Sequence, residues 1–306
     1  MTVHEHRGRG ILLALLSATG FSTLGLFAKL IYGEGFSVPG ALAWRFTAAS
    51  LFLWAFVFVT KRALPKPLWP VILLGFLGFA PQAGLYFVTV SILDPGIAGL
   101  LLYLYPSFVV IIGLVVFRKR PGWIRTAALL LSLAGCLLTF WKAGNYPPLG
   151  IAMGVITAVF YAAYLVVGDR TLKEVDPIAA TALIMTAAAL VYWSIALGTG
   201  SAKLPSSPVS VVGILGVALV ATVLPVTTLF ASMRIIGAAD TSLVSTLEPV
   251  LTIGLSSLLI GEKFGPPQLA GGALIVVAVL LIDLAPRLAG RKAAGESGSG
   301  AGPIAY

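Results

Sequence analysis

The sequence predicts an all-α polytopic membrane protein, with ten transmembrane helices arranged as two inverted five-helix repeats around a central cavity. The first observation is composition: 58% of the 306 residues are hydrophobic and 10% are charged, whereas soluble domains carry about 25% charged residues. The second is the recurrence of apolar runs of about 20 residues, the length that crosses a bilayer. The third is the placement of Lys and Arg on alternate loops.

Ten apolar runs can be read, and the loops between them are too short to hold a soluble domain. The first follows Arg7 and Arg9, is a full span long and lacks a small-residue cleavage site, so we expect a retained helix. The runs are 10–32, 39–60, 69–91, 95–117, 122–141, 148–168, 177–197, 208–233, 240–260 and 266–285. We expect a first repeat over 1–146, a second, inverted repeat over 147–286, and a disordered cytoplasmic tail over 287–306 that is rich in Gly, Ser and Ala.

Positive charge predicts the orientation of these spans. Fifteen Lys and Arg residues fall in loops on one side and three on the other, which places both termini in the cytoplasm. The net charge of +9 is spread over short loops, which favours lipid headgroups as the partner and excludes nucleic acid. The single cysteine, Cys136, lies in an apolar run and excludes a disulfide framework within the chain.

Four prolines interrupt apolar runs in matched pairs. Pro81 and Pro106 lie in the first half, and Pro225 and Pro249 in the second. A proline removes a backbone hydrogen bond and bends a helix, so we expect all four to act as hinges. A shift of about 143 residues places Gly99–Pro106 on Ser242–Pro249. Because each half holds an odd number of spans, the second half enters from the opposite face, a pattern typical of transporters.

These features carry a family resemblance. The ten spans, the five-plus-five repeat and the stretch Leu247-Glu248-Pro249-Val250 followed by Gly261-Glu262 resemble the drug/metabolite transporter superfamily, EamA type. The tyrosine-rich third and fourth spans resemble bacterial aromatic amino-acid exporters of the YddG type. The resemblance implies an exporter in the bacterial inner membrane that works by alternating access, and it adds spans one and six to the wall of the cavity. The short loops and self-contained bundle fit a monomer.

Candidate substrate-binding residues follow from the broken helices and from helical spacing. Gln82 and Tyr86 share one face of the third span, since they are four residues apart. Tyr103 and Tyr105 face one cavity only if the proline distorts the helix between them. Aromatic rings could stack on a flat side chain, but plain packing or an interfacial aromatic belt is the alternative. The full set is Trp44, Gln82, Tyr86, Tyr103, Tyr105, Tyr161, Tyr164 and Thr246.

Ionisable residues within spans are few. Lys29 and Arg45 lie near predicted external ends, and Asp240 is placed to cap the ninth span. Glu248 lies two turns into that span, where it could titrate, bind a substrate amine or pair with Arg45. An interior so poor in charge favours a carrier of neutral or zwitterionic amino acids without ion coupling. A proton-coupled exporter of another small metabolite or an aromatic drug-like cation is the alternative.

The sequence lacks the residues that other classes of membrane protein require. An intramembrane enzyme needs a catalytic or metal-binding constellation inside the bilayer, but His4 and His6 precede the first span and no acid pair lies at mid-depth. We therefore expect no enzyme, cofactor or metal. A channel needs polar rings along its pore, and the aromatic middle argues against it. A scaffold without transport activity would show no substrate-dependent flux or stabilisation.

Overall fold

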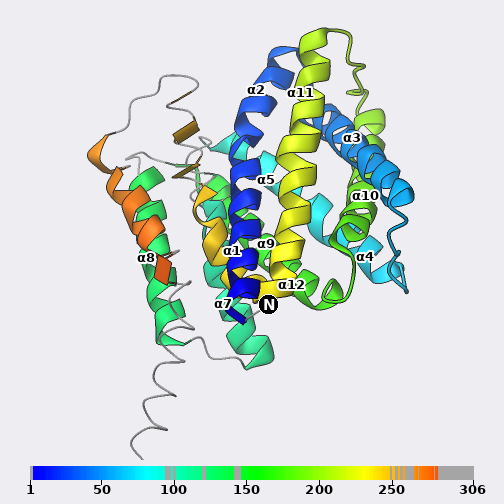
Figure 1. The fold of residues 1–306 in the computed structure, drawn as a ribbon. Helices are drawn as coiled ribbons and strands as arrows, with labels where there is room; N and C mark the ends of the chain where they lie inside the picture. Colours follow the sequence, from blue (N-terminus) through cyan, green and yellow to red (C-terminus); the bar gives the residue numbers. More distant parts are fainter. Residues whose placement is uncertain are drawn as a thin grey trace, which may run out of the picture.

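The computed structural model describes residues 3–93, 98, 101–118, 122–140, 146–248, 250–251, 254–255, 258, 265–267, 269–278 and 280–281. All regular structure in this part of the chain is helical, as predicted (Figure 1). The predicted tail, residues 287–306, lies outside the described residues, as does Pro249.

Each of the first eight predicted spans overlaps at least one described helix, whereas the ninth and tenth are described only in part. Their bounds are α1 (Val3–Ser22), α2 (Leu24–Gly33), α3 (Val38–Val59), α4 (Trp69–Leu73), η1 (Leu74–Phe79), α5 (Ala80–Ile92), α7 (Tyr105–Phe117), α8 (Trp123–Phe140), α9 (Pro148–Thr171), α10 (Pro177–Gly198), α11 (Pro208–Ala218), η2 (Leu219–Val223) and α12 (Leu224–Ser245). A further short apolar helix covers Leu269–Ala278. The first predicted span is divided at Thr23, and α12 runs through a non-helical residue, Gly237, with φ of 80°.

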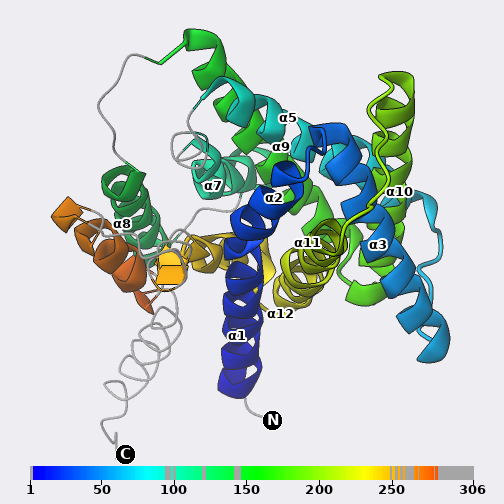
Figure 2. The ribbon, with the colours of Figure 1, turned by 90° about the horizontal axis from the view of Figure 1, so that it is seen from above.

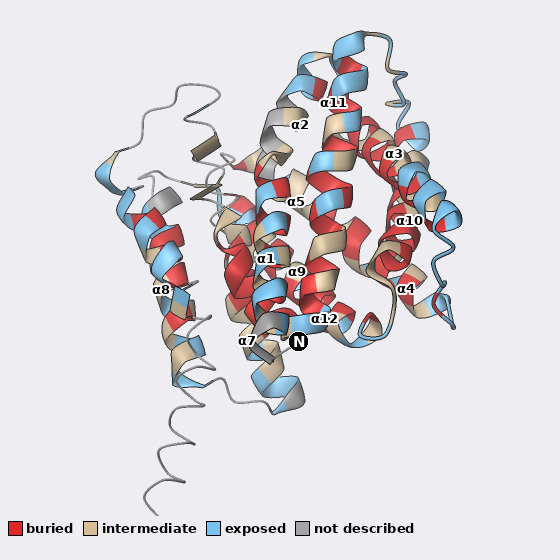
Figure 3. Cartoon of the chain, in the orientation of Figure 1, coloured by how far each residue is buried: buried red, intermediate tan, exposed pale blue. Residues whose placement is uncertain are grey.

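Five of the described helices are long and apolar enough to cross a membrane. They are Val38–Val59, Trp69–Thr89, Pro148–Thr171, Pro177–Gly198 and Pro208–Ser245. Buried residues face the interior of the bundle, while outer faces carry exposed apolar side chains such as Phe58 and Val115, each 70% exposed (Figure 3). Side chains of this kind are stable against lipid and unfavourable in water. The structure therefore fits a polytopic membrane protein.

Helix starts are set by prolines and by capping side chains. Ser37 accepts a hydrogen bond from the backbone N–H of Gly40 at the start of α3, and Asp176 accepts from Ile178 and Ala179 at the start of α10. Ser207 forms a reciprocal capping box with Ser210 on α11. Each of these helices has a proline in its first turn, where the missing N–H has no helical partner to lose.

Helices from the two halves of the sequence pack directly against each other. α1 lies along α12 and α3 lies along α10, and these are the two most extensive helix contacts. Seen from above, α3, α10 and α11 form one side of the molecule and α8 lies at the opposite side (Figure 2). Small residues permit the close approach: a Cβ atom at Gly75 of η1 would lie 2.7 Å from the Cβ of Ala187 on α10.

Matched irregularities occur at the proline positions of both halves. The π-helical turn η1 ends two residues before Pro81, and η2 ends two residues before Pro225. The fourth span is interrupted at Tyr103 and Leu104 before Pro106, and the ninth at Thr246 and Leu247. In both interruptions the backbone N–H bonds three residues back, from Leu104 to Leu101 and from Thr246 to Leu243, each at 3.2 Å. The helices are thus broken where the prolines predict, while the hinge role and the inverted relation of the halves stay predictions.

Polar contacts join several connections at one end of the bundle, which we call the arginine end. Arg62, after α3, donates to Asp176, before α10, at 2.9 Å. Arg234 on α12 donates to the backbone oxygen of Lys173 at 3.1 Å. Arg7 and Arg125 both contact Asp240 at this end. This is the end that positive charge predicts to be cytoplasmic.

Candidate functional site

A cavity of about 100 Å³ lies at the centre of the bundle. Its wall combines residues from both halves of the chain, supplied by α1, α2, α3, η1, α5, the broken fourth span, α9 and the interrupted ninth span. The lining residues are Phe21, Leu24, Arg45, Phe79, Gln82, Ala83, Tyr86, Phe87, Leu102, Tyr103, Tyr105, Tyr161 and Glu248. The wall is thus largely aromatic and holds one basic and one acidic side chain.

The structure brings most of the predicted binding residues to this cavity. Gln82, Tyr86, Tyr103, Tyr105 and Tyr161 all line it. Tyr103 and Tyr105 share the wall because the fourth span is interrupted between them, as their spacing requires. The ring centroids of Tyr105 and Tyr161 are 4.6 Å apart. The hydroxyl of Tyr105 donates to the backbone oxygen of Ser242 at 3.2 Å. Their role in binding a substrate stays a prediction.

Three predicted binding residues lie elsewhere. Tyr164 stacks on Tyr161 at 6.2 Å between ring centroids and lines a separate lateral groove beside Leu74 and Phe160. The hydroxyl of Thr246 is buried and donates to the backbone oxygen of Leu243. Trp44 donates its indole N–H to the backbone oxygen of Lys203 at 2.7 Å. The side chain of Lys29 is outside the description.

Several cavity residues were missed by the sequence reasoning. Phe79, Ala83 and Phe87 line the cavity and follow one another at intervals of four. Residues four apart share a helix face, so this stripe next to Gln82 and Tyr86 was a usable signal. Phe21 and Leu24 come from the break between α1 and α2, which no proline marks.

Glu248 and Arg45 are the charged residues of the cavity wall. The half-buried carboxyl group of Glu248 accepts a hydrogen bond from the hydroxyl of Tyr103. The guanidinium of Arg45 is buried and donates from Nε to the hydroxyl of Thr222 at 2.7 Å. The ion pairs found among the described residues do not include one between Arg45 and Glu248. Each charge is therefore a separate feature of the wall.

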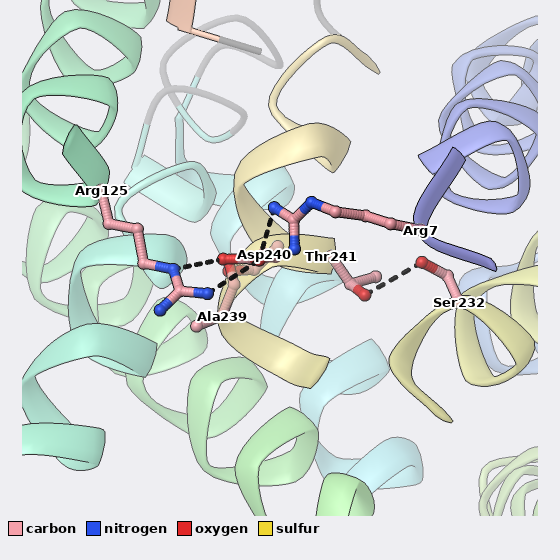
Figure 4. A network of polar contacts seen from close by, with 7 residues as sticks. Arg7, Arg125, Ser232, Ala239, Asp240 and Thr241 are labelled. Carbon is pink, nitrogen blue, oxygen red and sulfur yellow. Dashed lines mark hydrogen bonds and ion pairs between the residues drawn. The ribbon is translucent and has the colours of Figure 1, made fainter. Parts of the chain in front are cut away.

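Asp240 has a different role from the predicted helix cap. Its carboxylate is 1% exposed, accepts two hydrogen bonds from Arg125 and forms an ion pair with Arg7 (Figure 4). The capping role belongs to Asp169, which accepts from the backbone N–H of Ala238 at 3.0 Å. Asp240 lies two residues further into the helix, so its side chain reaches across to α1 and α8 instead of back to its own N-terminus.

Within the part of the chain that the structure describes, no group of three or more His, Cys, Asp or Glu side chains is placed to hold a metal ion. The chemistry available at the cavity is therefore that of aromatic rings, hydroxyl groups, one amide and two opposite charges. Such a wall can bind and orient a small solute.

Comparison with known proteins decides the class of the molecule. The sequence profile of the EamA-like transporter family matches residues 8–141 and again residues 148–283. The chain belongs to the EamA-like transporter family. Membership makes this a multi-pass membrane protein of a transporter family.

Relatives agree with this assignment. The chain is 25% identical over 284 residues to the uncharacterized transporter YcbK of Bacillus subtilis, covering 88% of this chain and 91% of that protein. It is 28% identical over 151 residues to the uncharacterized transporter sll1319 of Synechocystis, covering 46% of each. It is 28% identical over 160 residues to the uncharacterized transporter YdfC of Bacillus subtilis, covering 49% of this chain and 52% of that protein. The chain thus matches about half the length of the latter two relatives.

A solved structure shares the fold. A protein of known crystal structure superposes with a TM-score of 0.75 at 21% identity, covering 91% of this chain and 97% of the other. At this identity the likeness concerns the fold alone.

Proposed function

We propose that this EamA-family protein exports amino acids with aromatic and other neutral, apolar side chains across the bacterial inner membrane. The observation that carries the proposal is the central cavity, in which tyrosine and phenylalanine rings from both halves surround two opposite charges. Rings of this kind stack on a flat apolar group while hydroxyls fix its orientation.

The size of the cavity favours a small solute. Pockets that enclose drug-sized ligands measure about 300–1,000 Å³, whereas this cavity measures about 100 Å³. An amino acid needs a modest widening of that space, and a drug-like aromatic cation needs a larger one. Size therefore ranks amino acids above drug-like cations.

Alternating access is the mechanism that the broken helices support. The π-helical turns before Pro81 and Pro225, and the interruptions in the fourth and ninth spans, lie around the cavity and occur once in each half. Irregular turns of this kind let a helix bend without losing its flanking hydrogen bonds. Movement at matched positions would expose the cavity first to one side of the membrane and then to the other.

We further propose that transport needs no ion gradient. Arg45 and Glu248 are the only two Asp, Glu, Lys or Arg side chains among the described residues that line the cavity, whereas ion-coupled carriers place several acidic groups at mid-depth. Metabolism would supply the driving force by keeping the inner concentration of solute high. The test is flux of radiolabelled amino acids from liposomes that contain the purified protein. Loss of flux when the pH gradient is abolished at a fixed amino-acid gradient would contradict uncoupled transport.

A proton-coupled exporter of another metabolite or of an aromatic cation is the second candidate. It is favoured by one observation, the Glu248 carboxyl group that faces the cavity and bonds to Tyr103. A carboxyl group there can exchange a proton for a cationic solute. Saturable flux of an aromatic cation, with none for amino acids, would select this candidate.

A further inference from the structure

Arg45 is a cation held inside the protein, on the wall of the cavity. Only 6% of the residue is exposed, and it lies seven residues into α3, about 10 Å from the start of that helix at a rise of 1.5 Å per residue. A buried charge without a counter-charge is costly in a membrane protein, so such residues usually serve a function. Arg45 therefore requires an explanation beyond packing.

The contacts of Arg45 leave most of its donors unused. A guanidinium carries five N–H donors, and the Nε donor bonds to the hydroxyl of Thr222 at 2.7 Å. Among the described residues, no carboxylate pairs with Arg45 and no second hydrogen bond engages its terminal nitrogens. The central carbon of the group lies 5.0 Å from the ring centre of Phe46, a contact that uses no donor.

Thr222 fixes the direction in which these donors point. Thr222 lies in η2, and its own hydroxyl proton is directed to the backbone oxygen of Val217 on α11 at 2.6 Å. The hydroxyl oxygen therefore accepts the bond from Arg45 instead of donating. With Nε held by α11–η2 of the second half, the terminal nitrogens of Arg45 are presented in a defined orientation on a wall shared with Gln82 and Tyr86.

We propose that Arg45 binds the carboxylate of the transported solute, so that the carrier accepts acids and zwitterions and rejects amines that lack a carboxylate. The inference rests on the proposed function and names the feature by which that cavity selects its substrate. Two terminal nitrogens match the two oxygens of a carboxylate, and such paired, charge-assisted bonds are strong and directional. A solute without this group would leave the buried charge unsatisfied, which is the strongest basis for rejection.

A purely structural Arg45 would join α3 to η2 without touching a ligand. The two roles are separated by a set of related compounds: phenylalanine, phenethylamine, which lacks the carboxylate, and 3-phenylpropionate, which lacks the ammonium. We would measure the melting temperature of the detergent-purified protein with each compound, and inhibition of phenylalanine counterflow in liposomes. For the wild type, we expect phenylalanine to raise the melting temperature and inhibit counterflow at concentrations at least about 100-fold below those that phenethylamine needs.

Variants assign this selectivity to the guanidinium. Arg45→Met should remove the difference between phenylalanine and phenethylamine, and Arg45→Lys, which keeps the charge but loses the paired geometry, should restore part of it. Arg62→Met is the matched control, since it removes an arginine from an exposed ion pair at the arginine end and should leave the difference intact. If Arg45→Met does not fold, Thr222→Val tests the orientation instead, and should weaken phenylalanine at least about 10-fold with phenethylamine unchanged.

Each outcome decides the inference. Equal action of phenylalanine and phenethylamine on the wild type, or a preference for phenylalanine that survives in a folded Arg45→Met protein, would overturn it. So would inorganic phosphate acting as well as 3-phenylpropionate, or an unchanged Thr222→Val protein where that variant is needed. If 3-phenylpropionate stabilises the wild type but not Arg45→Met, and no amino acid stabilises either, Arg45 binds carboxylates but the proposed amino-acid export is wrong. If none of the compounds acts on the wild type, both fail.

Discussion

The Nε atom of Arg125 lies 2.7 Å from Oδ1 of Asp240, and this bond ties α8 of the first half to the start of the ninth span in the second. Arg7 of α1 completes the arrangement at 2.9 Å from the other carboxylate oxygen (Figure 4). The same helix segment continues to Ser242, whose backbone oxygen accepts from Tyr105 of the cavity wall. The arginine end and the cavity are therefore connected through a few residues of one segment.

Replacing Asp240 should destabilise the protein markedly. Asp240→Asn removes the counter-charge of Arg7 and Arg125, whose side chains are 17% and 45% exposed, and loss of hydrogen bonds to a charged group costs about 1.5–3 kcal/mol. Asp176→Asn is the matched control, because its ion pair with Arg62 is more exposed and asparagine still caps α10; we expect about 1 kcal/mol or less there. Thermal unfolding followed by tryptophan fluorescence measures both. Equal losses of stability in the two variants would contradict a larger contribution from the ion pairs of Asp240.

Loss of the cavity tyrosines should strongly reduce transport while leaving the fold intact. Tyr86→Ala and Tyr103→Ala each remove a ring from the cavity wall, and loss of ring stacking and hydroxyl contacts should lower amino-acid flux at least about 10-fold. Trp69→Ala is the control, since Trp69 is 62% exposed on the outer face. Counterflow in liposomes checks the result, with melting temperatures as the measure of folding. Unchanged flux in both tyrosine variants would disprove the assignment of the cavity as the binding site.

Neutralising Glu248 should distinguish the two proposed modes of transport. If transport is uncoupled, Glu248→Gln retains exchange of amino acids and shows no change in its response to a pH gradient. A carboxyl group that carries the coupling proton gives the opposite result, because exchange of solute for solute continues while flux driven by the gradient is lost. Parallel assays of exchange and of gradient-driven flux in the same liposomes separate these results.

The contact of Gly20 on α1 with η2 and Pro225 leaves no room for an added side-chain atom. In the present state a Cβ atom at Gly20 would lie 2.9 Å from both the Cδ of Pro225 and the backbone oxygen of Val220. Gly20→Ala should therefore destabilise by about 1–3 kcal/mol through overpacking. Gly8→Ala on the same helix meets nothing within 4 Å and should stabilise by up to about 1 kcal/mol through helix propensity. Opposite shifts in melting temperature are expected, and shifts of the same sign would contradict the close packing.

Several spans and some of their ends could be predicted from the sequence because the signals are local. The predicted run 177–197 became α10 (Pro177–Gly198), where Asp176 and Pro177 form the start. The cavity could be predicted in part, since Gln82 and Tyr86 are four residues apart and share one helix face. Tyr164 lines a different groove from Tyr161, because the rotation of α9 within the bundle decides which ring meets the cavity, and a spacing of three residues does not show that rotation. The ion pairs of Asp240 involve Arg7 and Arg125, which are remote in the chain, so they could not be predicted from the local sequence.

The two π-helical turns determine which side chains face the cavity, because they set the rotation of the helix that follows. A π turn holds one residue more than the α-helical turn it replaces, and one residue corresponds to about 100° of rotation. Each turn therefore acts as a single-residue insertion that sets which side chains beyond it point inward. Deleting one residue from η1 would return the helix to a regular α form and rotate Gln82 and Tyr86 away from the solute. In η2 the same deletion would remove Thr222 from Arg45.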